Sequence, residues 1–194
     1  MVDAAWRSLR WPGTEHVRVS EAEDGWHLEG WAVHVMDGTP SRAHYRLGCD
    51  RHWSARSLVI TLAGAHPPAR RELYGDGAGG WKDARGQVLA DLDGARDIDI
   101  SSTPATNTLP VRRLRLQPGD ECRLKVVYIR LPVLTVSVVE QTYRCTSVSF
   151  GQSRYRYSSG SFSTEFQVDD HGLVADYPGV WERIPLGHDD EGIR

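Results

Sequence analysis

Polar and apolar residues alternate along most of the chain with the period of a β-strand. Leu58, Ile60 and Leu62, for example, alternate with Val59 and Thr61, which indicates a strand buried on at least one face. About a dozen such signals follow one another, with turn residues roughly every 8–12 positions. This spacing is typical of an all-β sandwich, barrel or roll, and we predict a mainly β fold.

The strand pattern changes parity at Gly30. Trp26 and Leu28 share one face before this glycine, and Trp31, Val33 and Val35 share a face after it. A β-bulge at Gly30 would keep all five side chains on the core side of the sheet. We therefore expect a bulge at this position.

One stretch is suited to a central helix. Thr103-Pro104 fits an N-cap followed by proline at the first helical position, and Thr106 with Pro110 fits a later start. We predict a single helix over about residues 104–116. Its apolar residues would cover much of its circumference, as in a helix enclosed by sheet: Leu109, Val111, Leu114 and Leu116.

The 194 residues suffice for one sizeable core, and the chain shows no internal repeat and no linker. We predict a single domain over residues 1–194, with an ordered core from about 14 to 185 and a polar C-terminal tail over 187–194. No window approaches the roughly 18 apolar residues of a membrane span, and we see no secretory signal. The formal net charge of −3 favours neither nucleic acid nor an anionic membrane as a partner.

The three cysteines indicate the compartment. Cys49, Cys122 and Cys145 are odd in number, widely separated and without the spacing of a disulfide framework or a structural zinc site. Reduced thiols in a cytoplasmic protein are the simplest interpretation.

Asp97-x-Asp99 is the first candidate for chemistry. On a strand, both carboxylates point to the same face, about 7 Å apart. Such a pair can bind a divalent metal, but the pattern is common by chance. A solvated strand face, or carboxylates paired with Arg112 and Arg113, is the better-supported interpretation.

The familiar catalytic motifs are missing. The glycine-rich run 75–80 is not followed by the Gly-Lys-Ser/Thr of a phosphate-binding loop, and Gly151-Gln152-Ser153-Arg154-Tyr155 lacks the last glycine of a nucleophile elbow. None of the eight histidines has a metal-ligand spacing. We therefore predict no catalytic residue, no metal and no cofactor.

Aromatic residues are numerous, with seven tryptophans and seven tyrosines. Their rings offer flat apolar faces with a polar edge, which suit sugar rings or the mouth of a lipid site. Most of them are expected to pack the core of a curved sheet. Together with polar Thr, Asn, Arg and Gln groups, they are consistent with a ligand cavity.

The segment 97–114 resembles the signature of the bacterial putative glycolipid-binding family. It contains Asp97-Ile98-Asp99, Thr103-Pro104 and the run from Thr106 to Leu114. The resemblance extends over about residues 17–183, with an expected aromatic replaced by Ala105. Supporting segments in register are Gly79-Gly80-Trp81, Val127-Tyr128-Ile129, Gln141-Thr142-Tyr143 and Asp176-Tyr177-Pro178-Gly179.

The resemblance implies a spiral β-roll, in which a long curved antiparallel sheet wraps around the single helix of residues 104–116. It also implies a homodimer, and a likeness to bacterial lipoprotein-localisation factors, which carry acyl chains in a half-open barrel. In a helix wrapped by sheet, the charged residues of segment 97–114 are expected to form a buried paired network.

The resulting prediction is a non-catalytic protein that holds a glycolipid or an acyl chain in the roll. One alternative is an enzyme that acts on a sugar or phosphate group through Asp97, Asp99, Asn107 and Arg112, and another is a structural or regulatory dimer without a small ligand. The candidate ligand-binding residues are Trp81, Asp97, Asp99, Thr103, Asn107, Arg112, Arg113, Tyr128, Gln141 and Tyr143.

Overall fold

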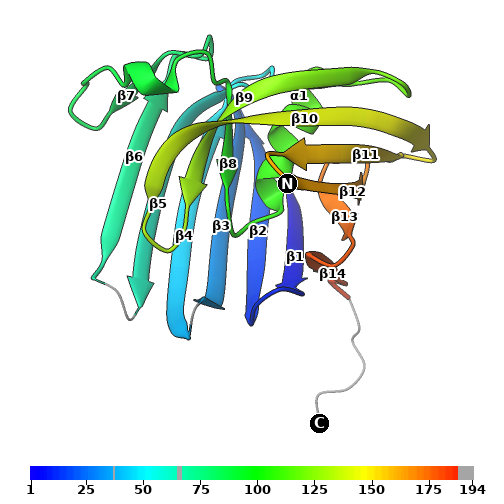
Figure 1. Ribbon diagram of the computed structural model, residues 1–194, viewed down its shortest axis with the longest axis horizontal. Coiled ribbons are helices and arrows are strands. Elements are labelled where there is room, and N and C mark those ends of the chain that lie inside the picture. Colours follow the sequence, from blue (N-terminus) through cyan, green and yellow to red (C-terminus); the bar gives the residue numbers. More distant parts are fainter. Residues whose placement is uncertain (37, 65–66, 188–194) are drawn as a thin grey trace.

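The computed structural model describes residues 1–36, 38–64 and 67–187, and these form one fourteen-stranded sheet with a single short α-helix (Figure 1). From residue 188 onward, the polar tail predicted for 187–194 lies outside the described part of the chain. The helical segments are η1 (Ala90–Leu92), η2 (Ala105–Asn107) and α1 (Thr108–Leu114). The strands are β1 (Val2–Ser8), β2 (Gly13–Ala22), β3 (Gly25–Met36), β4 (Thr39–Cys49), β5 (Ala55–Gly64), β6 (Ala69–Gly75), β7 (Trp81–Asp83), β8 (Asp97–Ile100), β9 (Glu121–Arg130), β10 (Thr135–Ser149), β11 (Gln152–Ser159), β12 (Phe162–Val168), β13 (Val174–Tyr177) and β14 (Trp181–Ile184).

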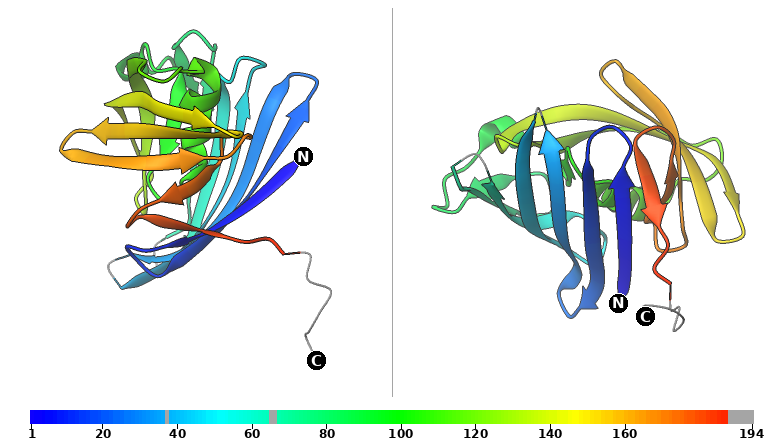
Figure 2. Two further views of the ribbon diagram at one scale, coloured as in Figure 1. Left: turned by 90° about the vertical axis from the view of Figure 1, so that its right-hand side faces the viewer. Right: turned by 90° about the horizontal axis from the view of Figure 1, so that it is seen from below.

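The sheet is an open curled roll, as the resemblance implied. Its strand order is β7-β6-β5-β4-β3-β2-β1-β14-β13-β12-β11-β10-β9-β8, so the first and last strands pair in its middle. Strands β9 and β10 cross over the upper part of β1–β5, and α1 lies between these two parts (Figures 1 and 2).

The sheet is antiparallel except at one edge, where β8 pairs with β9 in parallel. Parallel neighbours need a crossover connection instead of a hairpin, and a helix usually supplies it. Here the connection contains η2 and α1. This crossover places the helix on the inner face of the sheet.

Strand β1 begins at Val2, well before the ordered core that was predicted to start near residue 14. It lies at the centre of the sheet between β2 and β14. Its Trp6 is fully buried, and the indole Nε1 donates a hydrogen bond to the Val174 carbonyl at 2.8 Å. The N-terminal strand therefore joins the two halves of the roll.

The bulge predicted at Gly30 is absent. Gly30 pairs in continuous register with Val17 on one side and Tyr45 on the other, so Trp31 and Val33 point outward and are 42% and 61% exposed. The glycine is there for space: a Cβ atom would lie 2.2 Å from the Tyr45 ring. The parity change therefore reflects two apolar side chains, Trp31 and Val33, on the outer face of β3 and not a kink.

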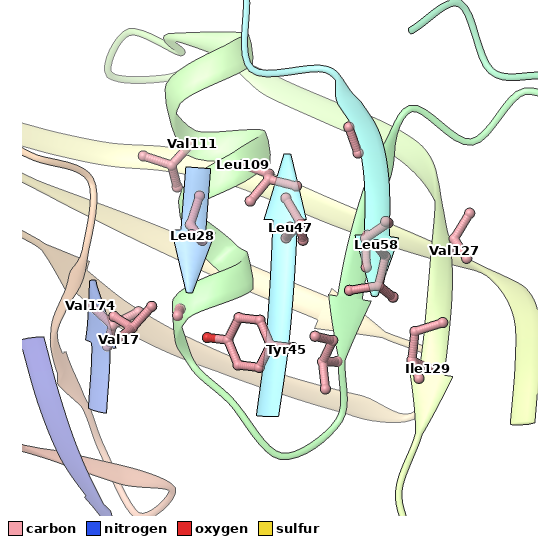
Figure 3. Packing of buried hydrophobic residues seen from close by; sticks show 14 of the residues in the cluster. Val17, Leu28, Tyr45, Leu47, Leu58, Leu109, Val111, Val127, Ile129 and Val174 are labelled. Carbon is pink, nitrogen blue, oxygen red and sulfur yellow. The ribbon is translucent and has the colours of Figure 1, made fainter. Parts of the chain in front are cut away.

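The helical segment is shorter than predicted, and α1 ends where Arg115 adopts a left-handed conformation with φ of 49°. Leu109 and Val111 are buried in the core of the roll, whereas Leu114 is only half-buried. Figure 3 shows Leu109 and Val111 directed at residues of the sheet, including Leu47. The first turn of α1 is therefore enclosed by the core, whereas its last turn is only half-buried.

This packing predicts different costs for two leucine truncations in α1. Leu109→Ala should lower the free energy of unfolding by about 2–5 kcal/mol, because it leaves a cavity in a closed core. Leu114→Ala removes the same atoms from a half-buried position and should cost clearly less. Urea denaturation of the two variants beside the wild type measures the difference, and equal losses would contradict the deeper burial of the first turn of α1.

Candidate ligand-binding site

A cavity of about 440 Å³ lies where the end of β8 and the segment leading into η2 face strands β9–β14. Its inner part is polar and its walls are largely aromatic. The side chains that line it come from eight parts of the chain, and they are Arg10, Trp11, Asp99, Ile100, Ser101, Thr103, Asn107, Tyr128, Val139, Tyr157, Ser159, Phe162, Tyr177, Val180 and Trp181.

Asp99 is the centre of the polar part. Its Oδ1 accepts a hydrogen bond from the Thr106 hydroxyl at 3.0 Å, and its Oδ2 accepts one from Gln141 Nε2 at 2.6 Å. The Tyr143 hydroxyl has two acceptors within hydrogen-bonding distance, Asn107 Oδ1 at 2.9 Å and Gln141 Oε1 at 3.2 Å. A continuous network therefore holds the carboxylate and the Asn107 amide at the cavity.

Burial raises the pKa of Asp99, while the hydrogen bonds from Gln141 and Thr106 lower it in part. In the described part of the chain, no basic side chain forms an ion pair with this carboxyl group. Burial, and next the charge of Asp99, also raise the pKa of Tyr128 and Tyr177. These phenols therefore remain protonated and can donate hydrogen bonds inside the cavity.

A second carboxyl group, Glu15 of β2, lies just behind the cavity wall. It is 2% exposed, and its Oε1 accepts a hydrogen bond from the Tyr45 hydroxyl at 2.6 Å. Its other oxygen is buried without a partner in the described structure. Burial raises the pKa of Glu15 to about 7, although the hydroxyls of Thr103 and Tyr45 act in the opposite direction. Since Thr103 lines the cavity, one side chain separates Glu15 from it.

Aromatic rings form the opposite wall. Trp11 and Trp181 pack edge to face with ring centroids 5.6 Å apart, and the Arg10 guanidinium lies 5.0 Å from the centroid of the Phe162 ring. The Trp11 Nε1 donor is buried without a partner among the described residues. This wall thus combines apolar faces with one free hydrogen-bond donor.

Six of the ten predicted ligand-binding residues belong to this site. Asp99, Thr103, Asn107 and Tyr128 line the cavity. Gln141 and Tyr143 lie behind them in the hydrogen-bonding network. The structure thus brings together residues from β8, η2, β9 and β10 that the sequence places up to 44 positions apart.

The other four predicted residues lie elsewhere. The Arg113 guanidinium binds both oxygens of buried Asp97, at 3.0 and 2.5 Å, and this pair ties α1 to β8. Trp81 is buried and donates to the carbonyl of residue 95 at 2.7 Å. Arg112 stacks 5.4 Å from the ring centroid of Trp53. Asp97, Asp99, Asn107 and Arg112 therefore do not form the single polar site of the enzyme hypothesis.

The sequence indicated aromatic side chains for a cavity, but of the rings that line it only Tyr128 was among the predicted ligand-binding residues. Trp11, Tyr157, Phe162, Tyr177 and Trp181 line it, and none of these was predicted. They come from the chain's two ends, which meet only because β1 pairs with β14. No local pattern reports that pairing.

Metal-binding clusters and membrane-spanning helices are both absent from the residues that the structure describes. No group of three or more His, Cys, Asp or Glu side chains is placed to hold a metal ion. Among the helices of the same residues, none has the length and apolar character needed to cross a membrane.

Comparisons with known proteins place these features in context. A family model described as putative glycolipid-binding matches residues 3–183. A crystal structure of a DUF1089 family protein from Pseudomonas aeruginosa is similar to this chain, with 33% identity and a TM-score of 0.80, and the match covers 89% of this chain and 92% of that one. No match was found among curated proteins.

The buried carboxyl of Glu15 predicts a pH-dependent stability. Its pKa rises from an ordinary 4.5 to about 7 on folding, so the unfolded chain loses the proton first as the pH rises. Folding stability should therefore fall by about 3 kcal/mol between pH 4.5 and 7 from this group alone. Glu15→Gln keeps an acceptor for Tyr45 and should gain stability over the wild type by up to that amount at pH 8, and little at pH 4.5.

Urea denaturation at both pH values measures this difference. Glu182→Gln, at a half-exposed position of β14, is the matched control and should show no comparable change with pH. If Glu15→Gln shifted the stability equally at both pH values, Glu15 would not titrate in this range on folding.

Proposed function

The chain belongs to the family described as putative glycolipid-binding, and from this membership we propose that it is a non-catalytic protein that holds a lipid or glycolipid in the Asp99 cavity. The observation that carries the proposal is the cavity itself, because its polar inner part and aromatic wall match the two parts of an amphiphile. At about 440 Å³, its volume is in the range of small-molecule sites.

The chemistry of the lining supports binding more than catalysis. Among the described residues that line the cavity, Asp99 is the only carboxyl group, and no histidine, cysteine or lysine accompanies it. General acid–base or nucleophilic catalysis usually needs a pair of such groups within hydrogen-bonding reach. Hydrogen-bonding side chains beside flat rings are instead suited to holding a sugar or a hydroxyl-rich head group.

We also propose that the protein works in the cytoplasm. Its three cysteines are free thiols in the structure, which supports a reducing compartment. The homodimer that the family resemblance implies stays a prediction.

A cavity-filling variant tests the proposed function. Octyl β-D-glucoside, kept below its micelle concentration, should bind to the wild type in isothermal titration calorimetry. Val139→Trp places a large ring on a cavity-lining position of β10 and should weaken this binding at least about tenfold, because the ring occupies the ligand's space.

Val33→Trp is the control, since Val33 is exposed on β3, and it should bind the glucoside like the wild type. The proposal fails if the wild type binds neither this glucoside nor other single-chain lipids, or if Val139→Trp binds them unchanged.

A further inference from the structure

We propose that the ligand enters this cavity head group first, so that an uncharged, hydroxyl-bearing head group lies against Asp99 and the alkyl chain runs outward past Phe162. This inference rests on the proposed function, since it presumes an amphiphile in this cavity. It adds the class of head group, the orientation of the ligand and the residue that decides between charged and neutral ligands.

The burial of the lining residues sets the orientation. Thr103 and Asn107, at the polar end beside Asp99, are buried. At the other end Arg10 is exposed and Phe162 is half-buried. Thr103 and Asn107 therefore lie deep in the cavity, and Arg10 and Phe162 lie nearer to solvent.

The charges of the site disfavour an anionic head group. Asp99 and Arg10 are the only charged residues among the described side chains of the lining, and they belong to its opposite ends. Among the residues that the structure describes, Asp99 receives hydrogen bonds only from the neutral Thr106 and Gln141, and no cation of this part of the chain offsets its charge. Glu15 adds a second carboxyl group behind Thr103. A phosphate, sulfate or carboxylate at this depth would meet like charge without a counterion.

A hydroxyl group can satisfy the hydrogen-bonding capacity that the protein leaves unused in this cavity. Each carboxylate oxygen of Asp99 accepts one hydrogen bond from a described side chain and can accept another. The Trp11 Nε1 donor is buried without a partner, which is costly unless an acceptor is supplied. A sugar hydroxyl both donates and accepts, so it can donate to the Asp99 carboxylate or accept from an unpartnered N–H group. An alkyl chain can do neither.

The opposite orientation makes the opposite prediction. A head group at the exposed end would lie beside Arg10, and that guanidinium would favour an anion. A preference for neutral ligands that depends on Asp99 therefore indicates a head group at the inner end. A preference for anionic ligands that depends on Arg10 indicates a head group at the exposed end.

Two ligands of equal chain length test the inference. Octyl β-D-glucuronide carries a carboxylate in place of the hydroxymethyl group of octyl β-D-glucoside and is otherwise identical to it. Their binding is compared by titration calorimetry at pH 7.5. The wild type should bind the glucoside at least about tenfold more tightly, as expected when like charges meet in a partly closed site. Asp99→Asn should bring the two affinities within about threefold of each other, because the amide removes the repulsion.

Asp176→Asn, the same substitution at an exposed position of β13, is the matched control and should keep the wild-type ratio. Circular dichroism and thermal unfolding establish that Asp99→Asn is folded. Arg10→Ala is a second variant, which tests the role of the guanidinium at the exposed end of the cavity. A wild-type preference for the glucuronide that Arg10→Ala abolishes would overturn the inference and leave the proposed function standing. Equal affinities in the wild type, or an unchanged ratio in folded Asp99→Asn, would overturn it as well. If neither ligand binds, and other single-chain lipids also fail, the proposed function itself fails.

Discussion

The link between β7 and β8 constrains the whole structure. These strands form the two edges of the fourteen-stranded sheet, yet they are consecutive in the chain and joined only by residues 84–96. A flat sheet of this size would be roughly 60 Å wide at the usual strand spacing. The link reaches at most about 50 Å when fully extended, and it also contains the turn of η1. The sheet therefore has to curl until its edges approach each other.

The curl creates an interior, and the crossover from β8 to β9 fills it. Because β8 and β9 are parallel, the chain between them passes over the sheet face and carries η2 and α1 inside. The two carboxyl groups of β8 then have different surroundings. Asp97 meets Arg113 and becomes a paired buried charge, whereas the donors that Asp99 meets in the described part of the chain are the neutral Thr106 and Gln141. The first contact holds the helix in place, and the second leaves an acceptor at the cavity.

The sequence indicated most of the polar part of the candidate site and little of its aromatic wall, because the two parts are encoded differently. Asp99, Thr103 and Asn107 lie within one segment of unusual composition, so reasoning over neighbouring residues finds them. Trp11 and Trp181 lie near opposite ends of the chain and meet through the β1–β14 pairing. Tyr45 and Glu15 look like ordinary strand residues, and only their buried contact shows a coupled polar pair. Local pattern carries no information about such contacts.

Alternation of polar and apolar residues was sufficient to determine a mainly β fold with one helix, because strand periodicity and proline-marked helix starts are local properties. The segment 97–114 was also recognisable as the exceptional part of the chain from its composition alone. Only the tertiary structure decided which face of β3 points inward and that Asp97, not Asp99, is paired with an arginine. It also decided which aromatic rings line the cavity at Asp99. These outcomes depend on register, curl and the meeting of the chain ends, which are set by contacts between residues distant in sequence.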